Sequence, residues 1–178
     1  MRIIAGKHRG KKLNPPNNLP ARPTTDFAKE SIFNILHNNF TLEKTKVLDL
    51  FAGTGNITFE FFSRGTKNIT CVEMHNGCLT FIIKTANELK TENIKIIKSE
   101  VLRYLKKETS KYHIIFADPP FVAEILEEVH QLVFENHLLE PGGWLIMEHP
   151  TKKKYSHLSK FAEERNYGSV KFSIFINQ

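Results

Sequence analysis

The chain has 178 residues, 40% of them hydrophobic and 25% charged, which suits one globular domain with a sizeable core and leaves no room for a second. No run approaches the roughly 18 to 20 apolar residues of a membrane span, and the N-terminus lacks the apolar region of a secretory signal. Neither the two cysteines, Cys71 and Cys78, nor the histidines have the spacing of a metal site. These features favour a cytoplasmic protein with reduced thiols, no metal and no membrane contact.

The positive charge is concentrated at the N-terminus. The chain has 25 basic and 19 acidic side chains, and residues 1–22 hold six of the basic ones and no acid, so the formal net charge of +6 lies entirely in this arm. A charged tail is often only soluble surface. A basic arm on a neutral body also suits a phosphate backbone. The six residues are Arg2, Lys7, Arg9, Lys11, Lys12 and Arg22.

The first elements predicted along the chain are a small hairpin and a linker. Apolar stretches alternate with Gly6 and Gly10 over residues 2–13, which is compatible with a hairpin. Four prolines in residues 14–23 fix φ and remove amide donors, so this segment should be extended. We therefore predict a basic extension over residues 1–24 and one domain over residues 25–178. That domain should begin with a helix capped by Thr25 or Asp26, with an apolar face of Phe27, Ile32, Phe33, Ile35, Leu36 and Phe40.

From residue 46 onward, strand and helix patterns alternate. Runs rich in Val, Ile, Leu and Phe predict strands over residues 46–51, 68–73, 93–98, 112–117 and 143–149. Helical periodicity predicts helices near residues 56–64, 76–90, 100–108 and 122–137. Residues 151–168 have no clean period, and an alternating run over residues 169–176 should close the sheet as an antiparallel hairpin. Apolar strands separated by helices predict a doubly wound, Rossmann-like α/β fold.

Two glycines follow the first predicted strand, at the edge of the sheet where open α/β folds bind ligands. In the run from Asp49 to Gly55, Gly53 and Gly55 let the backbone turn sharply and approach a ligand without a Cβ. A tight strand-to-helix turn would explain them equally well. Glu73, which ends the second strand about 20 residues later, strengthens the ligand interpretation because a carboxylate can accept ribose hydroxyls. The combination predicts a nucleoside-containing cofactor.

Two nucleoside cofactors fit these motifs, NAD and S-adenosylmethionine. A dinucleotide-binding loop needs a third small residue, and that position holds Thr58, followed by Phe59. NAD is therefore the poorer choice. We expect S-adenosylmethionine, with S-adenosylhomocysteine as its product.

The tetrapeptide Asp118-Pro119-Pro120-Phe121 follows the fourth predicted strand and suits a reaction at a planar amino group. Asp118 and the Pro119 carbonyl can each accept one N–H of the amine, which draws the nitrogen lone pair out of the ring and toward a methyl group. The prolines stiffen the loop, and Phe121 offers a ring on which a base can stack. Methyl transfer needs placement and a proton acceptor rather than a nucleophile. A rigid turn is the alternative, but beside the cofactor motifs we predict that these four residues are catalytic.

Together these motifs resemble the RsmD family of bacterial 16S ribosomal RNA guanine-N2 methyltransferases. The resemblance spans nearly the whole chain, with the motifs in the order of the family. It includes N-terminal motifs that generic Rossmann-like methyltransferases lack. The matching segments are Arg2-Ile3-Ile4-Ala5-Gly6, Arg9-Gly10, Arg22-Pro23-Thr24-Thr25-Asp26, Lys29-Glu30, Phe33-Asn34, Leu48 to Gly55, Glu73-Met74 and the tetrapeptide.

The resemblance implies a methyltransferase that modifies N2 of guanine 966 in 16S ribosomal RNA. It implies that the glycine loop wraps the methionine end of the cofactor, that Glu73 holds the ribose and that Glu100 lies near the adenine. The family often has Asp or Asn in place of Glu100. Lys29 stands where Arg is usual, which costs a bidentate contact if this residue meets a phosphate or the carboxylate of the cofactor. The predicted cofactor-binding residues are Thr25, Asp49, Phe51, Gly53, Gly55, Glu73 and Glu100.

The few residues after the catalytic segments, 151–178, cannot form the target-recognition domain that DNA amino-methyltransferases usually add. Recognition should come from the arm and from the shape of a folded RNA that presents an extruded base. We expect 16S ribosomal RNA, in the small subunit or an assembly intermediate, and no obligate protein partner. The tetrapeptide also suits adenine N6, so a DNA or RNA adenine-N6 methyltransferase is the alternative. A non-catalytic RNA-binding module is a second. The predicted RNA contacts are Lys7, Arg9, Lys11, Lys12 and Arg22.

Overall fold

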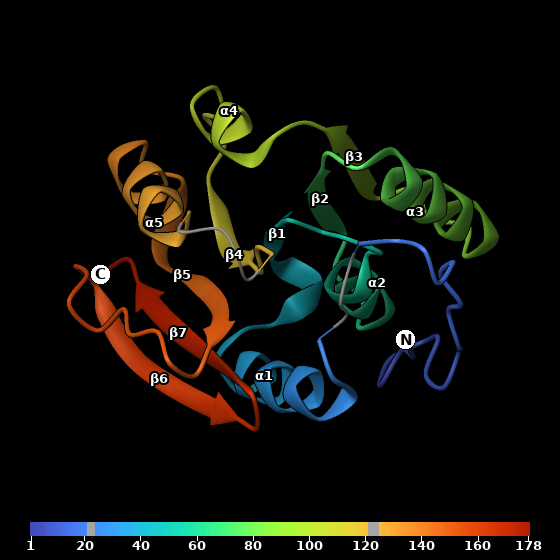
Figure 1. The fold of residues 1–178 in the computed structure, drawn as a ribbon, viewed down its shortest axis with the longest axis horizontal. Helices are drawn as coiled ribbons and strands as arrows, with labels where there is room; N and C mark the ends of the chain where they lie inside the picture. Colours follow the sequence, from blue (N-terminus) through green and yellow to red (C-terminus); the bar gives the residue numbers. More distant parts are fainter. Residues whose placement is uncertain (21–23, 121–124) are drawn as a thin grey trace.

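The computed structural model describes residues 1–20, 24–120 and 125–178, built around one sheet of seven strands in the order β3-β2-β1-β4-β5-β7-β6 (Figure 1). The first five strands in this order are parallel to one another, and β7 pairs antiparallel with both of its neighbours, β5 and β6. The parallel part follows the doubly wound strand order, which confirms the predicted fold class. The strands are β1 Lys46–Leu50, β2 Asn68–Glu73, β3 Ile94–Lys98, β4 Tyr112–Ala117, β5 Leu139–Pro150, β6 Phe161–Tyr167 and β7 Val170–Ile176.

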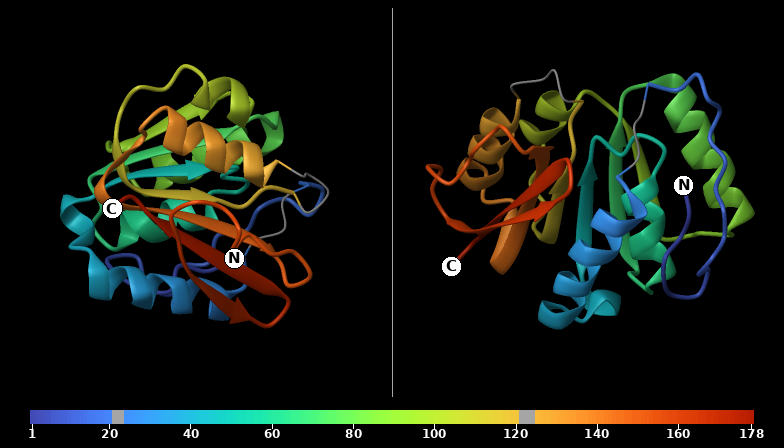
Figure 2. Two further views of the ribbon diagram at one scale, coloured as in Figure 1. Left: turned by 90° about the vertical axis from the view of Figure 1, so that its left-hand side faces the viewer. Right: turned by 60° about the horizontal axis from the view of Figure 1, so that its bottom comes forward.

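Helices cover both faces of the sheet (Figure 2). Along β1, Val47 packs into the apolar cluster of α1 and α2, while Leu48 and Leu50 pack into the cluster of α4 and α5. This burial on both sides explains why the parallel strands are almost continuously apolar. In the part of the chain that the structure describes, no helix is long and apolar enough to cross a membrane. The helices are α1 Asp26–Asn39, α2 Asn56–Ser63, α3 Asn76–Glu88, α4 Val101–Leu105 and α5 Leu126–Glu135.

The predicted strands and helices are confirmed with shifts at their ends, except that the start of the helix predicted over residues 122–137 lies outside the described residues. The predicted antiparallel closure is β7 against β5. One expectation was wrong, and one segment that the sequence left undecided forms a strand. That strand is β6, which lies within residues 151–168 and pairs with β7 alone at the edge of the sheet. An edge strand that is only partly buried does not need the alternation that reveals inner strands. Phe27 was expected on the apolar face of α1, but it lies in the first turn with 67% of its surface exposed.

The N-terminal arm folds back against α2 and α3. An isolated antiparallel bridge joins Arg2 to Lys12, and the Ile3 amide donates to the Lys11 carbonyl at 3.0 Å, so the expected hairpin is a single turn without regular strands. Ile3 and Leu13 are buried in one cluster with Phe59 of α2. The apolar side chains of the arm thus anchor it to the body, while its boundary at residue 24 stays a prediction.

Candidate active site

The loop between β1 and α2 has a left-handed backbone at three positions. Phe51, Gly53 and Gly55 have φ values of 61°, 56° and 78°. A Cβ on Gly55 would lie 2.7 Å from the ring of Phe59, so this position has no room for a side chain. Phe51 adopts a conformation that costs a residue with a Cβ about 1 to 2 kcal/mol. Such strain is common at ligand-binding loops.

Glu73, at the carboxyl end of β2, is hydrogen-bonded to this loop. Its side chain is buried, and Oε2 accepts the Gly53 amide at 2.7 Å. Oε1 accepts the amides of Met74 and His75 at 2.8 and 2.7 Å. A carboxylate has about four acceptor positions, so these three bonds fix its orientation and leave one position for a ligand hydroxyl. The residues present fit the ribose of a nucleoside cofactor.

Asp49 is buried in β1 and accepts the hydroxyl of Thr58, in α2, at 2.5 Å. Burial raises the pKa of Asp49 to about 7, and the bond from Thr58 opposes part of that increase. Through this contact Asp49 ties the strand to the helix that follows the glycine loop. A contact between Asp49 and the cofactor stays a prediction.

Asp118 comes directly after β4, between the ends of two neighbouring strands. Ala117 pairs with Leu50 of β1 and with Met147 of β5. Asp118 therefore lies next to Glu148, the residue that follows Met147 in β5. Burial is the main cause that raises the pKa of Asp118 well above its ordinary value, and the carboxylates of Glu148 and Asp49 raise it further. Of the predicted tetrapeptide, Pro119 is buried and Pro120 exposed. Phe121 lies outside the described residues.

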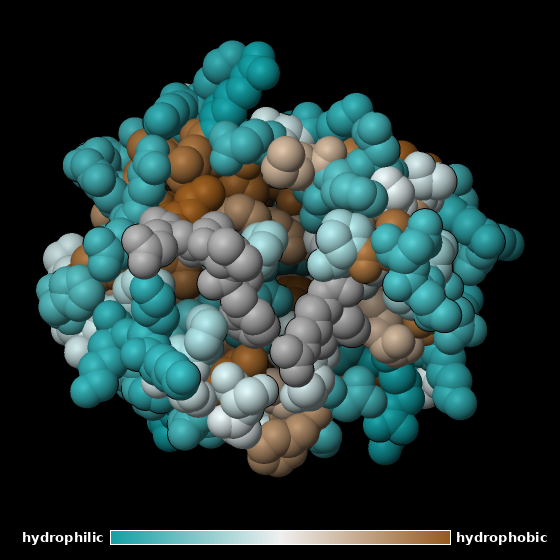
Figure 3. Space-filling view, viewed as in Figure 1, coloured by the Kyte–Doolittle hydropathy of each residue, from teal (hydrophilic) through white to brown (hydrophobic). Residues whose placement is uncertain are grey.

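Four carboxylates therefore gather at the carboxyl ends of β1, β2, β4 and β5. The face of the molecule drawn in Figure 3 is hollowed near its centre. The ionised members of this cluster produce a negative potential that favours a cationic ligand, and S-adenosylmethionine carries a sulfonium. Among the described residues, no group of three or more His, Cys, Asp or Glu is arranged to hold a metal ion. The four are Asp49, Glu73, Asp118 and Glu148, of which Glu148 was not predicted.

Two other predicted cofactor contacts cap helices. Glu100 accepts the amides of Leu102 and Arg103 at 2.9 and 2.8 Å, which fixes the start of α4. Thr25 accepts the Ala28 amide at 3.2 Å at the start of α1. Their roles toward a cofactor stay predictions. Met74 matched the family motif but was not among the predicted cofactor contacts. It follows Glu73 and has 64% of its surface exposed, so it offers an apolar contact beside the site.

The predicted RNA-binding residues in the arm lie on its outer side. The described members, Lys7, Arg9, Lys11 and Lys12, are all exposed, whereas Arg22 lies outside the described residues. The arm is held from its inner side by α2. Glu60, which is fully buried, accepts the amides of Ile4 and Ala5 at 2.8 and 3.1 Å.

A buried chain of polar side chains continues from Glu60 to the carboxylate cluster. Lys29 of α1 lies 3.4 Å from Glu60 and donates to Asn56 Oδ1 at 2.8 Å. Asn56 donates to the Thr24 carbonyl at 3.0 Å, and the Thr24 hydroxyl donates to Glu148 at 2.9 Å. The sequence suggested that Lys29 could meet a phosphate or the carboxylate of the cofactor. Instead it is 1% exposed, and its third donor binds the Arg2 carbonyl at 2.6 Å.

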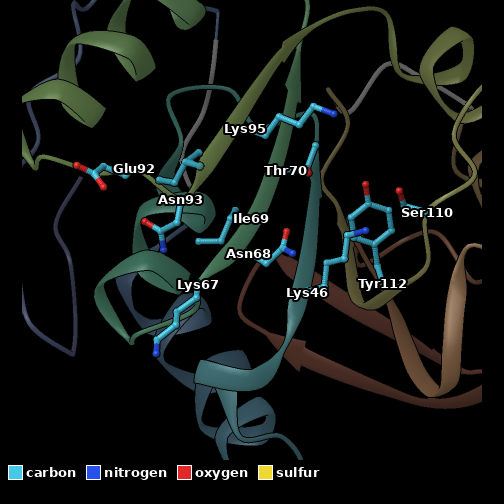
Figure 4. A pocket seen from close by; sticks show the side chains of 11 residues that line it. Lys46, Lys67, Asn68, Ile69, Thr70, Glu92, Asn93, Lys95, Ser110 and Tyr112 are labelled. Atoms are coloured by element: carbon cyan, nitrogen blue, oxygen red, sulfur yellow. The ribbon is translucent and has the colours of Figure 1, made fainter.

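A separate pocket of about 380 Å³ opens at the other end of the sheet (Figure 4). It lies at the amino ends of the parallel strands and includes Lys46, Lys67 and Lys95. The ammonium groups of these three side chains do not meet at one point in Figure 4, and Lys46 lies over the ring of Tyr112 at 4.7 Å. The pocket therefore lacks a converging cationic centre and is remote from the carboxylate cluster.

Comparisons of sequence place the chain among known proteins. A family model described as conserved hypothetical protein 95 matches residues 1–176. Ribosomal RNA small subunit methyltransferase D of Escherichia coli is 36% identical over 148 residues, which cover 83% of this chain and 71% of the relative. The protein of the same name in Haemophilus influenzae is 32% identical over 183 residues, which cover 99% of this chain and 94% of the relative.

Solved structures agree with these matches. A candidate methyltransferase from Escherichia coli superimposes with a TM-score of 0.86 and 29% identity, covering 100% of this chain and 98% of its own. A candidate methylase from Haemophilus influenzae superimposes with a TM-score of 0.81 and 30% identity, covering 99% and 97%. The glycine loop, the strand-end acids and the basic arm thus occur in a Rossmann-like methyltransferase fold. The chain belongs to the RsmD family of ribosomal RNA small subunit methyltransferases.

Proposed function

We propose that this protein transfers a methyl group from S-adenosylmethionine to the exocyclic N2 of a guanine in 16S ribosomal RNA. The observation that carries the proposal is the meeting of Asp118 with the glycine loop and Glu73 at one edge of the sheet. The names of the relatives support the class of RNA. The choice of guanine over adenine rests on membership of the family, because the tetrapeptide suits either amine.

The chain's own residues fit the cofactor. Gly53 and Gly55 allow close approach of the backbone, and Glu73 keeps an acceptor position for a ribose hydroxyl. A more distant RNA methyltransferase from Salinibacter ruber, 11% identical with a TM-score of 0.67, was solved with S-adenosyl-L-homocysteine. When bound, S-adenosylmethionine supplies an electrophilic methyl group on a cationic sulfonium, whose charge suits the four carboxylates.

The catalytic work of the chain is to orient an amine and to take its proton. Asp118 accepts one N–H of the target amine and the Pro119 carbonyl accepts the other, so the nitrogen lone pair turns out of the plane of the base. The raised pKa of Asp118 makes it a better proton acceptor than an ordinary Asp once it is ionised. Orientation and the removal of this proton are expected to supply most of the rate enhancement.

The outer face of the arm provides the surface for the substrate. Lys7, Arg9, Lys11 and Lys12 are exposed on a segment whose inner face is bound to α2. Phosphate contacts of this kind position an RNA without reading its sequence, so recognition depends on the shape of the folded substrate. The proposed substrate is 16S ribosomal RNA in a small subunit or an assembly intermediate, and the proposed location is the cytoplasm.

The experiment that tests this function follows transfer of a labelled methyl group to small ribosomal subunits, to their assembly intermediates and to duplex DNA. We expect transfer to a ribosomal substrate, with methylguanosine found by mass analysis of the nucleosides. Asp118→Asn should lower the rate at least about 100-fold and leave the binding of S-adenosylmethionine intact. Methyladenosine as the product would establish the alternative enzyme. Equal transfer to duplex DNA, or full activity of Asp118→Asn, would refute the proposal.

A further inference from the structure

Phe27, in the first turn of α1, presents its ring to solvent. Among the described residues, three large hydrophobic side chains are exposed, Phe27, Met74 and Ile83, and Phe27 is the only aromatic one. Thr25 caps α1, so Phe27 is the second residue of the helix and does not occupy a position of the hydrophobic staple that can fix a helix start. A single exposed apolar residue is ordinary on a protein surface, so its surroundings decide what it can do.

The ring of Phe27 is supported on one side by Tyr167, at the end of β6. The two ring centroids lie 5.9 Å apart and the ring planes meet at 78°. Tyr167 lies in turn 5.7 Å from the ring of Phe172, which is fully buried in β7. An edge-to-face contact holds a ring in place and covers only part of it. Phe27 and Tyr167, which we call the aromatic pair, therefore present one open ring in a fixed direction.

The aromatic pair lies at the carboxyl end of β5. Tyr167 pairs with Val170 across the turn from β6 to β7, and Val170 pairs with Pro150, the last residue of β5. This turn lies beside the start of α1 (Figure 2). The pair therefore borders the same edge of the sheet as the proposed methyl-transfer site.

A hydrogen bond joins the start of α1 to that site as well. The Thr24 hydroxyl, three residues before Phe27, donates to Glu148 of β5 at 2.9 Å, and Glu148 lies next to Asp118. From the end of β4, where Asp118 lies, three strand spacings lead across β5 and β7 to β6, which is about 14 Å at about 4.8 Å each. That separation is too long for the base that is methylated, and it suits a neighbouring nucleotide of the same RNA.

Cations lie on the segments next to the aromatic pair. Arg2 of the arm binds Asp26 of α1 at 3.1 Å, and 54% of its side chain stays exposed. A guanidinium has five N–H donors, so this ion pair leaves donors for a phosphate. Lys152 and Lys154 are exposed in the segment that follows Pro150. The phosphates that flank a base stacked on the pair would therefore meet positive charge.

We propose that the aromatic pair is a second contact for the RNA, at which Phe27 stacks on an unpaired base near the target guanine. This inference rests on the proposed function, and it adds to the substrate an unpaired base beside the extruded one. Stacking tolerates any base, because every base has a flat face. The contact thus adds affinity and fixes the direction in which the RNA strand enters the site, without reading its sequence.

The surroundings of Phe27 favour a nucleic acid over a protein partner. A protein interface usually brings several apolar side chains into one patch, whereas Phe27 stands between charged residues of α1. Asp26 is paired with Arg2, and Glu30 is exposed one turn beyond Phe27. The phosphates should therefore lie toward the arm and the lysines after β5, and the ring alone should touch the RNA at the start of α1.

The first test measures the affinity of the whole protein for protein-free 16S ribosomal RNA. Phe27→Leu removes the ring and keeps an apolar side chain. The affinity should fall about 5-fold or more, which is the loss expected for one stacked base. The slope of log affinity against log salt should stay as in the wild type, because no phosphate contact is removed. In active protein, KM for the RNA should rise by the same factor and kcat should stay unchanged.

The second test uses a ring that reports on stacking. Phe27→Trp should bind the RNA as tightly as the wild type, and its fluorescence should be quenched when RNA is added, because the base contacts the indole. The natural Trp144 is buried and gives a constant background. His37→Trp is the matched control, since His37 is exposed at the other end of α1, about 15 Å away. Its emission should not change with RNA.

The outcomes separate the two proposals. Wild-type affinity in folded Phe27→Leu, or unquenched emission of RNA-bound Phe27→Trp, overturns the inference even when the wild type transfers methyl groups. A loss of affinity that comes with a shallower salt slope also overturns it, because phosphate contacts would then have moved. So does a dimer that Phe27→Leu dissolves, since the ring would then serve a protein contact. A wild type that transfers no methyl group overturns the proposed function, whatever the binding measurements show.

Discussion

The carboxylate of Glu60, in the middle of α2, accepts the backbone amide of Ile4 at 2.8 Å, although 56 positions separate the two residues. The same carboxylate accepts the Ala5 amide and lies within 3.4 Å of Lys29 and 2.8 Å of Arg64. A buried carboxylate is tolerated when its oxygens are satisfied in this way. The arm therefore supplies some of the hydrogen bonds that the buried carboxylate of Glu60 needs. Its attachment can be tested separately from the methyl-transfer site.

Gly6→Ala should detach the arm. Gly6 has a φ of 82°, and a Cβ there would lie 1.8 Å from the Ser63 carbonyl oxygen, the atom that accepts the Lys7 amide at 2.7 Å. We expect loss of hydrogen-exchange protection in residues 1–13 and weaker RNA binding, with a stability loss of about 1 to 3 kcal/mol from overpacking.

Gly10→Ala is the matched control for this substitution. Gly10 also has a φ of 82°, but a Cβ there meets nothing within 4 Å. The Gly10→Ala variant has the same backbone strain of about 1 to 2 kcal/mol, but its new Cβ does not clash with Ser63. Equal protection of the arm in the two variants would show that the contact with Ser63 does not hold it.

Lys29→Met should destabilise the whole protein. The substitution leaves Glu60 buried beside fewer donors and removes the bonds to Asn56 and the Arg2 carbonyl. Breaking a buried pair from one side costs about 3 to 5 kcal/mol. Urea unfolding should show this loss, whereas Lys84→Met, in an exposed pair with Glu88 at 4.0 Å, should cost at most about 1 kcal/mol. Similar losses in the two variants would contradict the role assigned to Lys29.

The charge of the arm should set the salt dependence of RNA binding. Replacing both Lys11 and Lys12 with Gln should make the slope of log affinity against log salt shallower by about 1.4 to 1.8, if each contacts one phosphate. The control pair, Lys106 and Lys107, is equally exposed and follows α4, on the other face of the sheet. The same change there should leave the slope unaltered. A slope that does not respond to the arm would place the phosphate contacts elsewhere.

Asp49 should make the protein less stable as the pH rises toward neutrality. Its pKa in the folded state is about 7, above its ordinary value of 3.8, so the folded protein holds this proton more strongly than the unfolded chain does. The resulting stabilisation is complete below about pH 4 and is lost as the pH rises through 7.

Asp49→Asn removes this titration and can still accept the Thr58 hydroxyl. Between pH 4 and pH 8, the wild type should lose up to about 4 kcal/mol relative to the variant in urea unfolding. Acids that do not interact with Asp49 titrate alike in both proteins and cancel in the difference, whereas Asp118, whose pKa the Asp49 carboxylate raises, adds a contribution of its own. Parallel stability curves would mean that Asp49 has no raised pKa.

Local sequence patterns predicted the parallel sheet well because its strands are buried on both faces and bounded by polar turns. The residues 68–73 and 112–117 form strands with the predicted limits. The glycine loop and Glu73 were predicted to meet at one ligand, and they are hydrogen-bonded to each other. In a parallel sheet, successive strand ends share one edge, so order along the chain is enough to bring such residues together.

The contacts that depend on long-range packing were not visible in the sequence. Glu148 ends an apolar run and looked like part of a buried strand, and only the pairing of β5 with β4 places it beside Asp118. Lys29 looked available for an external anion, yet its partners come from the arm and from α2. Phe27 had the spacing of a core residue, but it is largely exposed and its ring contacts only the edge of the sheet that the structure describes, at Tyr167 of β6.

The docking of the arm on α2 uses its main chain, since the amides of Ile4, Ala5, Lys7 and His8 all bind Glu60 or Ser63. Every amino acid except proline supplies the same amide. Mutation can therefore exchange the outward side chains without dismantling the attachment. The surface that meets the substrate is free to diverge between species, while the scaffold that presents it stays under a separate, stricter selection.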